Sequence, residues 1–284
     1  MNKNTKFLIV GLGLIGGSYA KGLKKAGYEV GAIDVDLKSI NYALENKIVD
    51  SAYSEINEDY IKKFDIIVFA LYPHVFINWI KENQKYIKSH ALLTDVTGVK
   101  GAVVNEIQSI LREDLEFAAA HPMAGREVSG VYNADETIFE NANYIVTPTE
   151  KNTPEAIEKV KEIGQILKFK NIATLSVEEH DEMIGFLSQL THCIAISLMT
   201  CNDNHKLALY TGDSFRDLTR IARINENMWC ELFLLNKKEL IKQMDLFIKE
   251  FEKLKLAIEQ DDEATIKEMM KSSTLRRGYF DKNK

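Results

Sequence analysis

The chain has 284 residues, of which 45% are hydrophobic and 27% are charged. This composition is close to that of an average globular protein, so it excludes a disordered chain, a collagen and a small disulfide scaffold. The net charge of −6 at pH 7 argues against anionic partners such as nucleic acids or acidic membranes. The three cysteines show no CxxC spacing, so we expect reduced thiols rather than disulfides or a zinc site.

The longest apolar stretch near the N-terminus, Phe7 to Tyr19, is short and contains several glycines. It fits neither a membrane span nor a signal peptide. We therefore expect a soluble, cytoplasmic protein.

The first part of the chain alternates short apolar runs with helical patterns. Most of the runs are continuous, which is typical of strands buried on both faces of a parallel sheet. Strands are expected at Lys6–Val10, Tyr28–Asp34, Phe64–Leu71, His90–Asp95, Leu115–Ala120 and Asn143–Pro148, with Lys170–Ser176 as a candidate for a last one. Helices are expected at Ile15–Ala26, Leu37–Asn46, Val75–Lys88, Val99–Leu111 and Pro154–Leu167. This order predicts a doubly wound, Rossmann-type α/β domain over residues 1–175.

The second part, residues 176–284, contains no proline. Glu178–Thr200 and Glu226–Glu259 have the spacing of long helices, so we expect an all-α domain here. The apolar residues of the first stretch exceed what one small bundle buries on one face. They indicate either a subunit interface or an ordinary domain core, and the pattern does not separate these two.

A glycine-rich motif joins the first expected strand to the first helix. Gly11, Gly13 and Gly16 form the pattern GxGxxG. The first glycine permits a tight turn, the second a close approach of the backbone to a pyrophosphate, and the third close packing of helix on strand. The helix start that follows, which includes Leu14 and Ile15, offers free N–H groups and a partial positive charge to the phosphates.

An acidic residue follows this motif at the spacing that a dinucleotide-binding unit requires. Asp34 ends the second expected strand, 18 residues after Gly16, where a carboxylate binds the ribose hydroxyls. The same carboxylate would repel a 2′-phosphate, so the sequence predicts NAD rather than NADP. Asp36 is an alternative for this role. The alternative interpretation of Asp34 is an acidic loop residue without a ligand.

One histidine follows an apolar strand at the edge where ligands bind in open α/β sheets. His121 comes directly after the run Leu115–Ala120. A neutral imidazole there can take the proton of a substrate hydroxyl while a hydride leaves the same carbon, and Glu127 is a candidate to orient a polar group nearby. The alternative is an ordinary hydrogen-bonded histidine at a strand end. The other histidines are expected in a helix core, for His192, or at loops, surfaces and caps: His74, His90, His180 and His205.

A basic segment lies in the helical part. Arg216 and Arg220 are four residues apart, on one face of an expected helix. Arginine binds carboxylates in bidentate fashion, which fits a substrate with more than one carboxylate. The alternative is a set of surface arginines paired with nearby acids: Asp213, Asp217 and Glu226.

Several segments, taken in chain order, resemble the prephenate dehydrogenase family, whose pattern arogenate dehydrogenases share. They are the glycine loop, TDVTGVK at 94–100, HPMAGREVSG at 121–130, FRDLTRIA at 215–222, and Met228–Trp229. HPMAGRE and FRDLTRIA are specific to that family, whereas GxGxxG is not. The resemblance runs through both parts of the chain.

The resemblance implies NAD-dependent oxidative decarboxylation of prephenate to 4-hydroxyphenylpyruvate, on the route to tyrosine, without a metal. It implies that His121 hydrogen-bonds the ring hydroxyl of the substrate and that Arg220 binds a carboxylate. His192 then becomes a substrate-binding residue rather than a core residue, and the helical domain becomes the interface of a homodimer. Further residues are implied at or near the site: Arg216, Asp217 and Trp229.

The chain departs from the family pattern at two positions. Family members often carry a serine, contacting the substrate hydroxyl and the histidine, where this chain has Gly98. Thr97, one residue earlier, is a candidate catalytic residue that supplies the hydroxyl instead. Many members also carry a histidine where this chain has Gln189. Both departures leave prephenate and arogenate open as substrates.

Two other functions stay open from the residues alone. A 3-hydroxyacid-type dehydrogenase shares the domain order, but it relies on a lysine motif that we do not find and gives His121 no role. A non-catalytic NAD-sensing protein would need the glycine loop and Asp34 but neither His121 nor Arg220. The first strand begins at Lys6 and the sequence stops at Lys284, so we expect neither a fused chorismate mutase nor a regulatory ACT domain.

Overall fold

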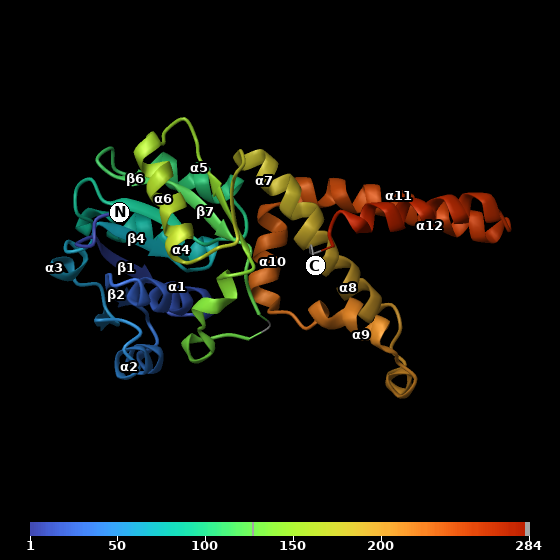
Figure 1. The fold of residues 1–284 in the computed structure, drawn as a ribbon, viewed down its shortest axis with the longest axis horizontal. Helices are drawn as coiled ribbons and strands as arrows, with labels where there is room; N and C mark the ends of the chain where they lie inside the picture. Colours follow the sequence, from blue (N-terminus) through green and yellow to red (C-terminus); the bar gives the residue numbers. More distant parts are fainter. Residues whose placement is uncertain (127, 282–284) are drawn as a thin grey trace. The chain divides into compact units, whose positions relative to one another are not determined.

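A computed structural model describes residues 1–126 and 128–281 (Figure 1). The chain forms two compact units, of which the first spans Met1–Asn236 and the second begins at Lys237. The first unit contains all the described strands and the helices up to α10. The division expected at residue 175 separates two kinds of secondary structure within this unit, and as a domain boundary it stays a prediction.

Six parallel strands form the central sheet of the first unit, in the order β3-β2-β1-β4-β5-β6. The strands are β1 (Lys6–Val10), β2 (Glu29–Ile33), β3 (Ser51–Tyr53), β4 (Ile66–Phe69), β5 (Leu92–Asp95) and β6 (Glu116–Phe117). This confirms the doubly wound, Rossmann-type sheet. The strand order reverses beside β1, and in such sheets ligands bind outside the carboxyl ends of the strands at this point.

Helices cover both faces of this sheet (Figure 1). Successive side chains of a strand point to opposite faces, so Phe7 and Ile9 of β1 join one core while Leu8 and Val10 join another. The first core is covered by α1 (Leu14–Lys25), α2 (Leu37–Glu45) and α6 (Pro154–Ile166). The second is covered by α3 (Glu58–Ile61), α4 (Pro73–Asn83) and α5 (Gly101–Ile110). The continuous apolar strands therefore follow from burial on both sides.

A second sheet corrects one expectation. It has the order β7-β8-β9, made of β7 (Ala119–Pro122), β8 (Asn143–Thr147) and β9 (Asn171–Thr174), with β7 antiparallel to β8. The single strand expected over Leu115–Ala120 is thus divided at Ala118. The N–H of Ala118 still donates to the carbonyl of Leu93 (3.0 Å), but the N–H of Ala120 donates to Oδ1 of Asp95 (3.1 Å). At Ala120 the hydrogen-bond acceptor is thus a side chain of β5 and no longer its backbone. From there the chain pairs with β8 as β7.

The helical part of the first unit begins at Ser176, which caps α7 (Val177–Ile184) in a capping box with Glu179. A π-helical segment, Gly185–Leu190, joins α7 to α8 (Thr191–Thr200). The helices α9 (Asp213–Thr219) and α10 (Glu226–Leu235) follow. Short 3₁₀ segments lie at Gln84–Tyr86, Val131–Asn133, Glu136–Phe139, His205–Leu209 and Arg220–Ala222.

The second unit is a pair of helices, α11 (Lys237–Glu259) and α12 (Glu263–Gly278), that pack against each other. Asp262 caps α12 by accepting the N–H of Thr265. The amphipathic stretch expected over Glu226–Glu259 is therefore not one helix, because it is interrupted at Asn236.

Candidate active site

The glycine loop follows β1 at the edge of the sheet where ligands bind. Gly11 has φ = +101°, a conformation that favours glycine. A Cβ at Gly16 would lie only 1.9 Å from the carbonyl oxygen of Gly11 and 2.9 Å from Cβ of Ala70. At Gly13, by contrast, no described atom lies within 4 Å of the Cβ position. Gly11 and Gly16 therefore allow the turn and the close packing of α1 on the sheet, and Gly13 leaves open space for a ligand.

The start of α1 faces this open space. Gly13 is its N-cap, and among the described residues no side chain caps the helix and no acid lies in its first turn. The backbone at Leu14 and Ile15 therefore presents the positive end of the helix to an anion. These features fit the pyrophosphate of a dinucleotide.

The two acids after β2 have different surroundings. Asp34 accepts the N–H of Leu12 in the glycine loop (2.5 Å) and the N–H of Asp36 (2.8 Å), which fixes its carboxylate beside the loop. Asp36 caps α2 by accepting from Lys38 and Ser39, and these hydrogen bonds, that from the Ser39 hydroxyl first, lower its pKa. The geometry favours Asp34 over Asp36 as the partner of a ribose.

His121 lies in β7, where its backbone pairs with Ile145 of β8. Its Nδ1 is 2.9 Å from Nε2 of His180, and Nδ1 of His180 is 2.8 Å from Oδ1 of Asp181. His180 is fully buried on α7, so the expectation of a surface or cap residue is wrong for it. The three side chains form one connected row.

The end of this row is anchored to α5. The carboxylate of Asp181 accepts the N–H of Lys100 at Oδ1 (2.8 Å) and the N–H of Gly101 at Oδ2 (2.7 Å). Burial alone would raise the pKa of Asp181, but the hydrogen bonds from His180, Lys100 and Gly101 outweigh burial and lower it. Asp181 is therefore a carboxylate held at a helix start.

A buried ion pair lies behind His121. The side chains of Lys100 and Asp95 are both fully buried, with Nζ and Oδ2 2.7 Å apart. Nζ of Lys100 also donates to the carbonyl of Ala120 (2.5 Å) and approaches Oγ1 of Thr97 (3.3 Å). Burial lowers the pKa of Lys100, although the charge of Asp95 acts in the opposite direction.

The hydroxyl of Thr97 belongs to this ion pair. It hydrogen-bonds Asp95 and lies 3.0 Å from the carbonyl of Val99, and the residue is only 4% exposed. A contact with substrate would require this hydroxyl to exchange its partners. A catalytic role for Thr97 stays a prediction, with a geometry that does not favour it.

Gly98 lies next to Nε2 of His121, whereas the hydroxyl of Thr97 is hydrogen-bonded to Asp95. A Cβ at Gly98 would lie 3.9 Å from Nε2 of His121 and 3.6 Å from the methyl groups of Leu232. Burial lowers the pKa of His121 well below its usual value, and the neighbouring His180 and the positive charge of Lys100 lower it further. His121 is therefore neutral at pH 7 and able to accept a proton.

Helix α10 connects this cluster to further predicted residues. Leu232 lies next to Gly98, and Trp229 is three residues earlier, on the same face of the helix. The ring of Trp229 stacks on His192 with centroids 3.6 Å apart. Nδ1 of His192 lies 2.8 Å from the carbonyl of Ser188, so this nitrogen carries the donated proton. The structure thus places His192 and Trp229 together, and Trp229 is one turn of α10 from Leu232, the neighbour of Gly98.

The arginine segment is divided. Arg220 begins the 3₁₀ segment, which packs against α8, the helix that carries His192. Arg216 lies on α9 and pairs with Asp213 (2.5 Å), as the surface alternative expected, and Asp217 on the same helix is exposed. The two arginines are therefore not on one α-helix. Substrate roles for these three residues stay predictions, and Glu127 lies outside the described residues.

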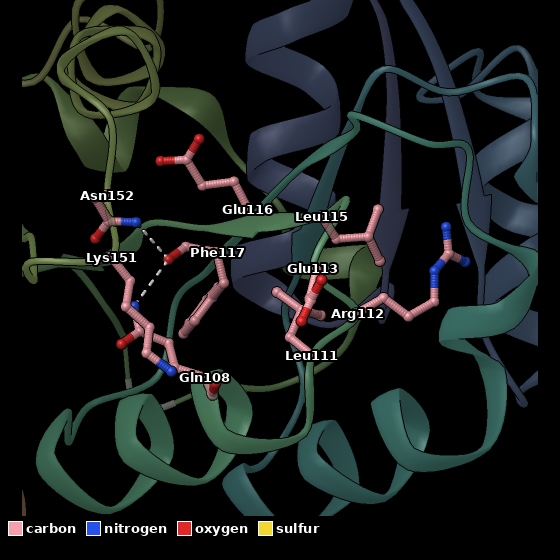
Figure 2. A pocket seen from close by; sticks show the side chains of 9 residues that line it. All are labelled: Gln108, Leu111, Arg112, Glu113, Leu115, Glu116, Phe117, Lys151 and Asn152. Atoms are coloured by element: carbon pink, nitrogen blue, oxygen red, sulfur yellow. Dashed lines mark hydrogen bonds between the residues drawn. The ribbon is translucent and has the colours of Figure 1, made fainter.

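A cavity on the first unit is lined by none of the predicted site residues. Figure 2 shows its lining, which comes from α5, from the loop between α5 and β6, from β6 and from the loop after β8: Gln108, Leu111, Arg112, Glu113, Leu115, Glu116, Phe117, Lys151 and Asn152. Lys151 donates to the carbonyl of Gln108 (2.8 Å) and Asn152 to that of Phe117 (2.8 Å). These donors already hold the cavity wall together, so the cavity is not a candidate active site.

Sequence reasoning missed His180, Asp181 and Lys100 as members of the site. The buried residues of α7 are Val177, His180, Asp181 and Ile184, the i, i+3, i+4, i+7 spacing of one helix face. This periodicity is the signal that could have placed His180 and Asp181 inside.

A Rossmann-type sheet with an open glycine loop, and a neutral histidine in the strand that follows the last parallel strand, define a dinucleotide-dependent dehydrogenase. The family model for the prephenate dehydrogenase nucleotide-binding domain matches residues 19–172, and the model for the prephenate dehydrogenase dimerization domain matches residues 176–272. The chain therefore belongs to the prephenate dehydrogenase family, which confirms the resemblance of its motifs.

Individual relatives agree with this assignment. A prephenate dehydrogenase of Bacillus subtilis (strain 168) is 32% identical over 90% of this chain and 70% of its own. A cyclohexadienyl dehydrogenase of Zymomonas mobilis is 26% identical over 93% of this chain and 92% of its own. The crystal structure of prephenate dehydrogenase from Aquifex aeolicus, in complex with hydroxyphenyl propionate and NAD⁺, superposes with a TM-score of 0.89 at 29% identity, covering 98% of each chain.

One helical stretch of the described chain, Val177–Thr200, is long and apolar enough to cross a membrane by length and composition. It lies within the part that matches the dimerization domain. In such a domain, exposed apolar side chains are also explained by a subunit interface. By itself it is weak evidence for a membrane.

Proposed function

We propose that this chain catalyses the NAD-dependent oxidative decarboxylation of prephenate to 4-hydroxyphenylpyruvate, in tyrosine biosynthesis. The observation that carries the proposal is the state of His121 in a chain of this family. Its Nδ1 is engaged by His180, its Nε2 lies next to Gly98, and its lowered pKa keeps it neutral. His121 is therefore a neutral base that accepts a proton at Nε2, the nitrogen next to Gly98.

The residues of the glycine loop support NAD as the cofactor. The start of α1 and the open space at Gly13 would hold the pyrophosphate, and Asp34 would hold the adenosine ribose. Bound NAD supplies the acceptor for the hydride. The carboxylate of Asp34 disfavours a 2′-phosphate, which supports NAD over NADP.

For this reaction the protein needs to position the substrate against the cofactor and to supply one general base. His121 takes the proton of the ring hydroxyl as the hydride leaves the same carbon. Loss of carbon dioxide makes the ring aromatic and drives the reaction, so a metal is not needed. Prephenate carries two carboxylates, and Arg220 is the proposed partner of one. His192 and Trp229 are proposed to line the same site, next to α10.

Arogenate is the second candidate substrate, because it differs from prephenate only by an amino group in place of the keto group on the side chain. The Zymomonas relative, named a cyclohexadienyl dehydrogenase, keeps this alternative open. The test measures NADH absorbance with purified protein, NAD and each substrate. Turnover with prephenate alone supports the proposal, and a preference for arogenate reassigns the substrate. No NADH with either would favour the NAD-sensing alternative.

His121→Asn tests the mechanism. We expect turnover to fall roughly a hundredfold or more, the usual contribution of a general base, while NAD affinity changes little. His90→Asn, at an exposed histidine in a turn, is the matched control and should leave both unchanged. Unchanged turnover in His121→Asn would remove the base from the mechanism.

We further infer a cytoplasmic homodimer formed through the helical part. The segment between α8 and α10 exposes large apolar side chains within the matched dimerization domain: Leu207, Leu209, Tyr210, Phe215 and Leu218. Sedimentation equilibrium should give twice the chain mass of 32.3 kDa. A monomer at micromolar concentration would contradict the inference.

A further inference from the structure

We propose that His180 and Asp181 fix the tautomer of His121 and that His180 is the next acceptor of the proton His121 takes from substrate. The proposal rests on the proposed function, in which His121 is the base. It assigns His180 as a positioning residue that acts through His121. The contacts that carry it are the row Asp181, His180 and His121.

The tautomers follow from the fixed end of the row. The carboxylate of Asp181 only accepts hydrogen bonds, so Nδ1 of His180 carries a proton and donates it. Nε2 of neutral His180 is then an acceptor. Nδ1 of His121, 2.9 Å away, must donate to it. This leaves the lone pair of His121 on Nε2, the nitrogen that faces Gly98.

The same row gives the proton a path. The substrate hydroxyl gives its proton to Nε2 of His121, and the O–H bond breaks as the new N–H bond forms. His121 then gives its Nδ1 proton to Nε2 of His180. His121 ends neutral, with its proton on Nε2, and His180 ends as an imidazolium hydrogen-bonded to the carboxylate of Asp181. No further reactant is needed for this transfer.

The charges around the row favour His180 as the place where the positive charge rests. Lys100 lies behind both histidines and disfavours a charge on either, and Asp95 neutralises part of its effect. His180 has Asp181 in direct contact, and this carboxylate raises its pKa against the lowering by burial. His121 has no such partner among the groups that shift its pKa.

The row is held rigidly at its far end. Two N–H groups of the α5 start bind the carboxylate of Asp181. The carbonyl of Asp181 accepts from the side chain of Asn236 (2.9 Å). The capping box of Ser176 and Glu179 sets the start of α7 and so the direction of His180. These contacts give Asp181 and His180 one position each.

Two substitutions of His180 separate positioning from proton transfer. His180→Phe keeps a buried ring but removes the acceptor for Nδ1 of His121. His180→Gln keeps an acceptor oxygen and a donor for Asp181, but its amide cannot take up a proton. Both variants, His90→Asn and the unaltered protein are compared by NAD affinity, by kcat and KM across pH, and by the solvent deuterium isotope effect on kcat.

The tautomer itself is read by ¹⁵N NMR of the histidine side chains, assigned through the variants, on the protein without substrate. We expect His121 to be protonated at Nδ1 in the unaltered protein and in His180→Gln, and in both tautomers in His180→Phe. We expect kcat to fall roughly ten- to a hundredfold in His180→Phe, the usual effect of losing a positioning partner, with KM and NAD affinity unchanged. His180→Gln should recover part of kcat and show a larger isotope effect.

Three results would overturn the proposal or a part of it. His121 protonated at Nε2 in the unaltered protein would overturn the tautomer assignment. An unchanged kcat and pH profile in His180→Phe would overturn the positioning role. Full activity with an unchanged isotope effect in His180→Gln would overturn the transfer to His180. Because the NMR measurement needs no substrate, it stands even if the proposed activity fails.

Discussion

At the scale of single residues, hydrogen bonds decide which of two similar side chains is held beside a ligand site. Asp34 and Asp36 are both acids after β2, but Asp36 binds the N–H groups at the start of α2, whereas Asp34 binds the N–H of Leu12 in the glycine loop. Spacing alone could not separate these two acids. The contacts can, because they hold Asp34 beside the glycine loop and Asp36 at the start of α2.

Asp34→Ala should weaken NAD binding and relax the exclusion of NADP. A hydrogen bond to a charged group contributes about 1.5–3 kcal/mol, so the KM for NAD should rise roughly tenfold or more, while the KM for NADP falls. Initial rates with each cofactor at saturating substrate measure both changes.

Asp36→Ala is the matched control for this substitution. It should cost about 1 kcal/mol of stability through the lost cap of α2 and leave the preference between the two cofactors unchanged. If Asp36→Ala shifts that preference and Asp34→Ala does not, the assignment of the two acids is reversed.

Gly98→Ser tests the departure of this chain from the family pattern. The nearest atoms to a new Cβ are at ordinary contact distance, 3.6 Å for Leu232 and 3.9 Å for Nε2 of His121, so stability should change by about 0.5 kcal/mol or less. The added hydroxyl would lie beside the base and beside the substrate hydroxyl. We expect a change in the KM for substrate that Gly98→Ala, which adds only the methyl group, does not reproduce. Equal kinetics for the two variants would show that the hydroxyl makes no contact.

At the scale of elements, the sequence predicts the helices and strands that are determined by their own local residue pattern. The buried strands and their helices were predictable because apolar runs and helical spacing are local properties. The division of β6 from β7 was not, because it depends on a hydrogen bond from Ala120 to Asp95. The break before α11 is similar, since Asn236 donates its side chain to Asp181 and Gln189. Contacts between distant residues override local pattern at both places.

The candidate site divides in the same way. The glycine loop follows a strand and His121 follows an apolar run, so the pattern of the chain marks both, although His121 lies within β7. His180 and Lys100 act through contacts between α7, α5 and β7, which only the folded chain brings together. Short elements such as β3 and α3 contain too few residues to show a period.

Gln189→Leu tests whether this position is structural. The Gln189 side chain is 1% exposed, donates to the carbonyl of Leu232 (2.9 Å) and accepts from Asn236 (2.8 Å). The substitution removes both of these hydrogen bonds. Each contributes about 0.5–1.5 kcal/mol, so the free energy of unfolding should fall by about 1–3 kcal/mol. Urea denaturation measures this, with Gln165→Leu at an exposed site on α6 as the control. The ratio of activities on prephenate and arogenate should stay the same; a changed ratio at unchanged stability would make Gln189 a specificity residue.

At the scale of the whole molecule, the same row of side chains makes stability depend on pH. The pKa of His121 and that of His180 are both lowered in the folded protein, chiefly by burial, while in the unfolded chain each is about 6.5. Below that pH the unfolded chain binds more protons than the folded one, so the free energy of unfolding falls as pH falls. Asp181, whose pKa is lowered from 3.8, contributes stability that is lost only as pH falls below about 4.

The interval from pH 6.5 to 5 should therefore isolate the histidines. Each contributes at most about 1.4 kcal/mol of lost stability per pH unit there, which chemical denaturation at fixed protein concentration can resolve. A double variant, His121→Asn with His180→Gln, removes both groups and should flatten the dependence over this interval, with little change at pH 8 beyond a constant offset. An equal slope in the unaltered protein and the double variant would mean that these two imidazoles accept protons in the folded state as readily as in water, and His121 would then lack the environment that keeps it a neutral base.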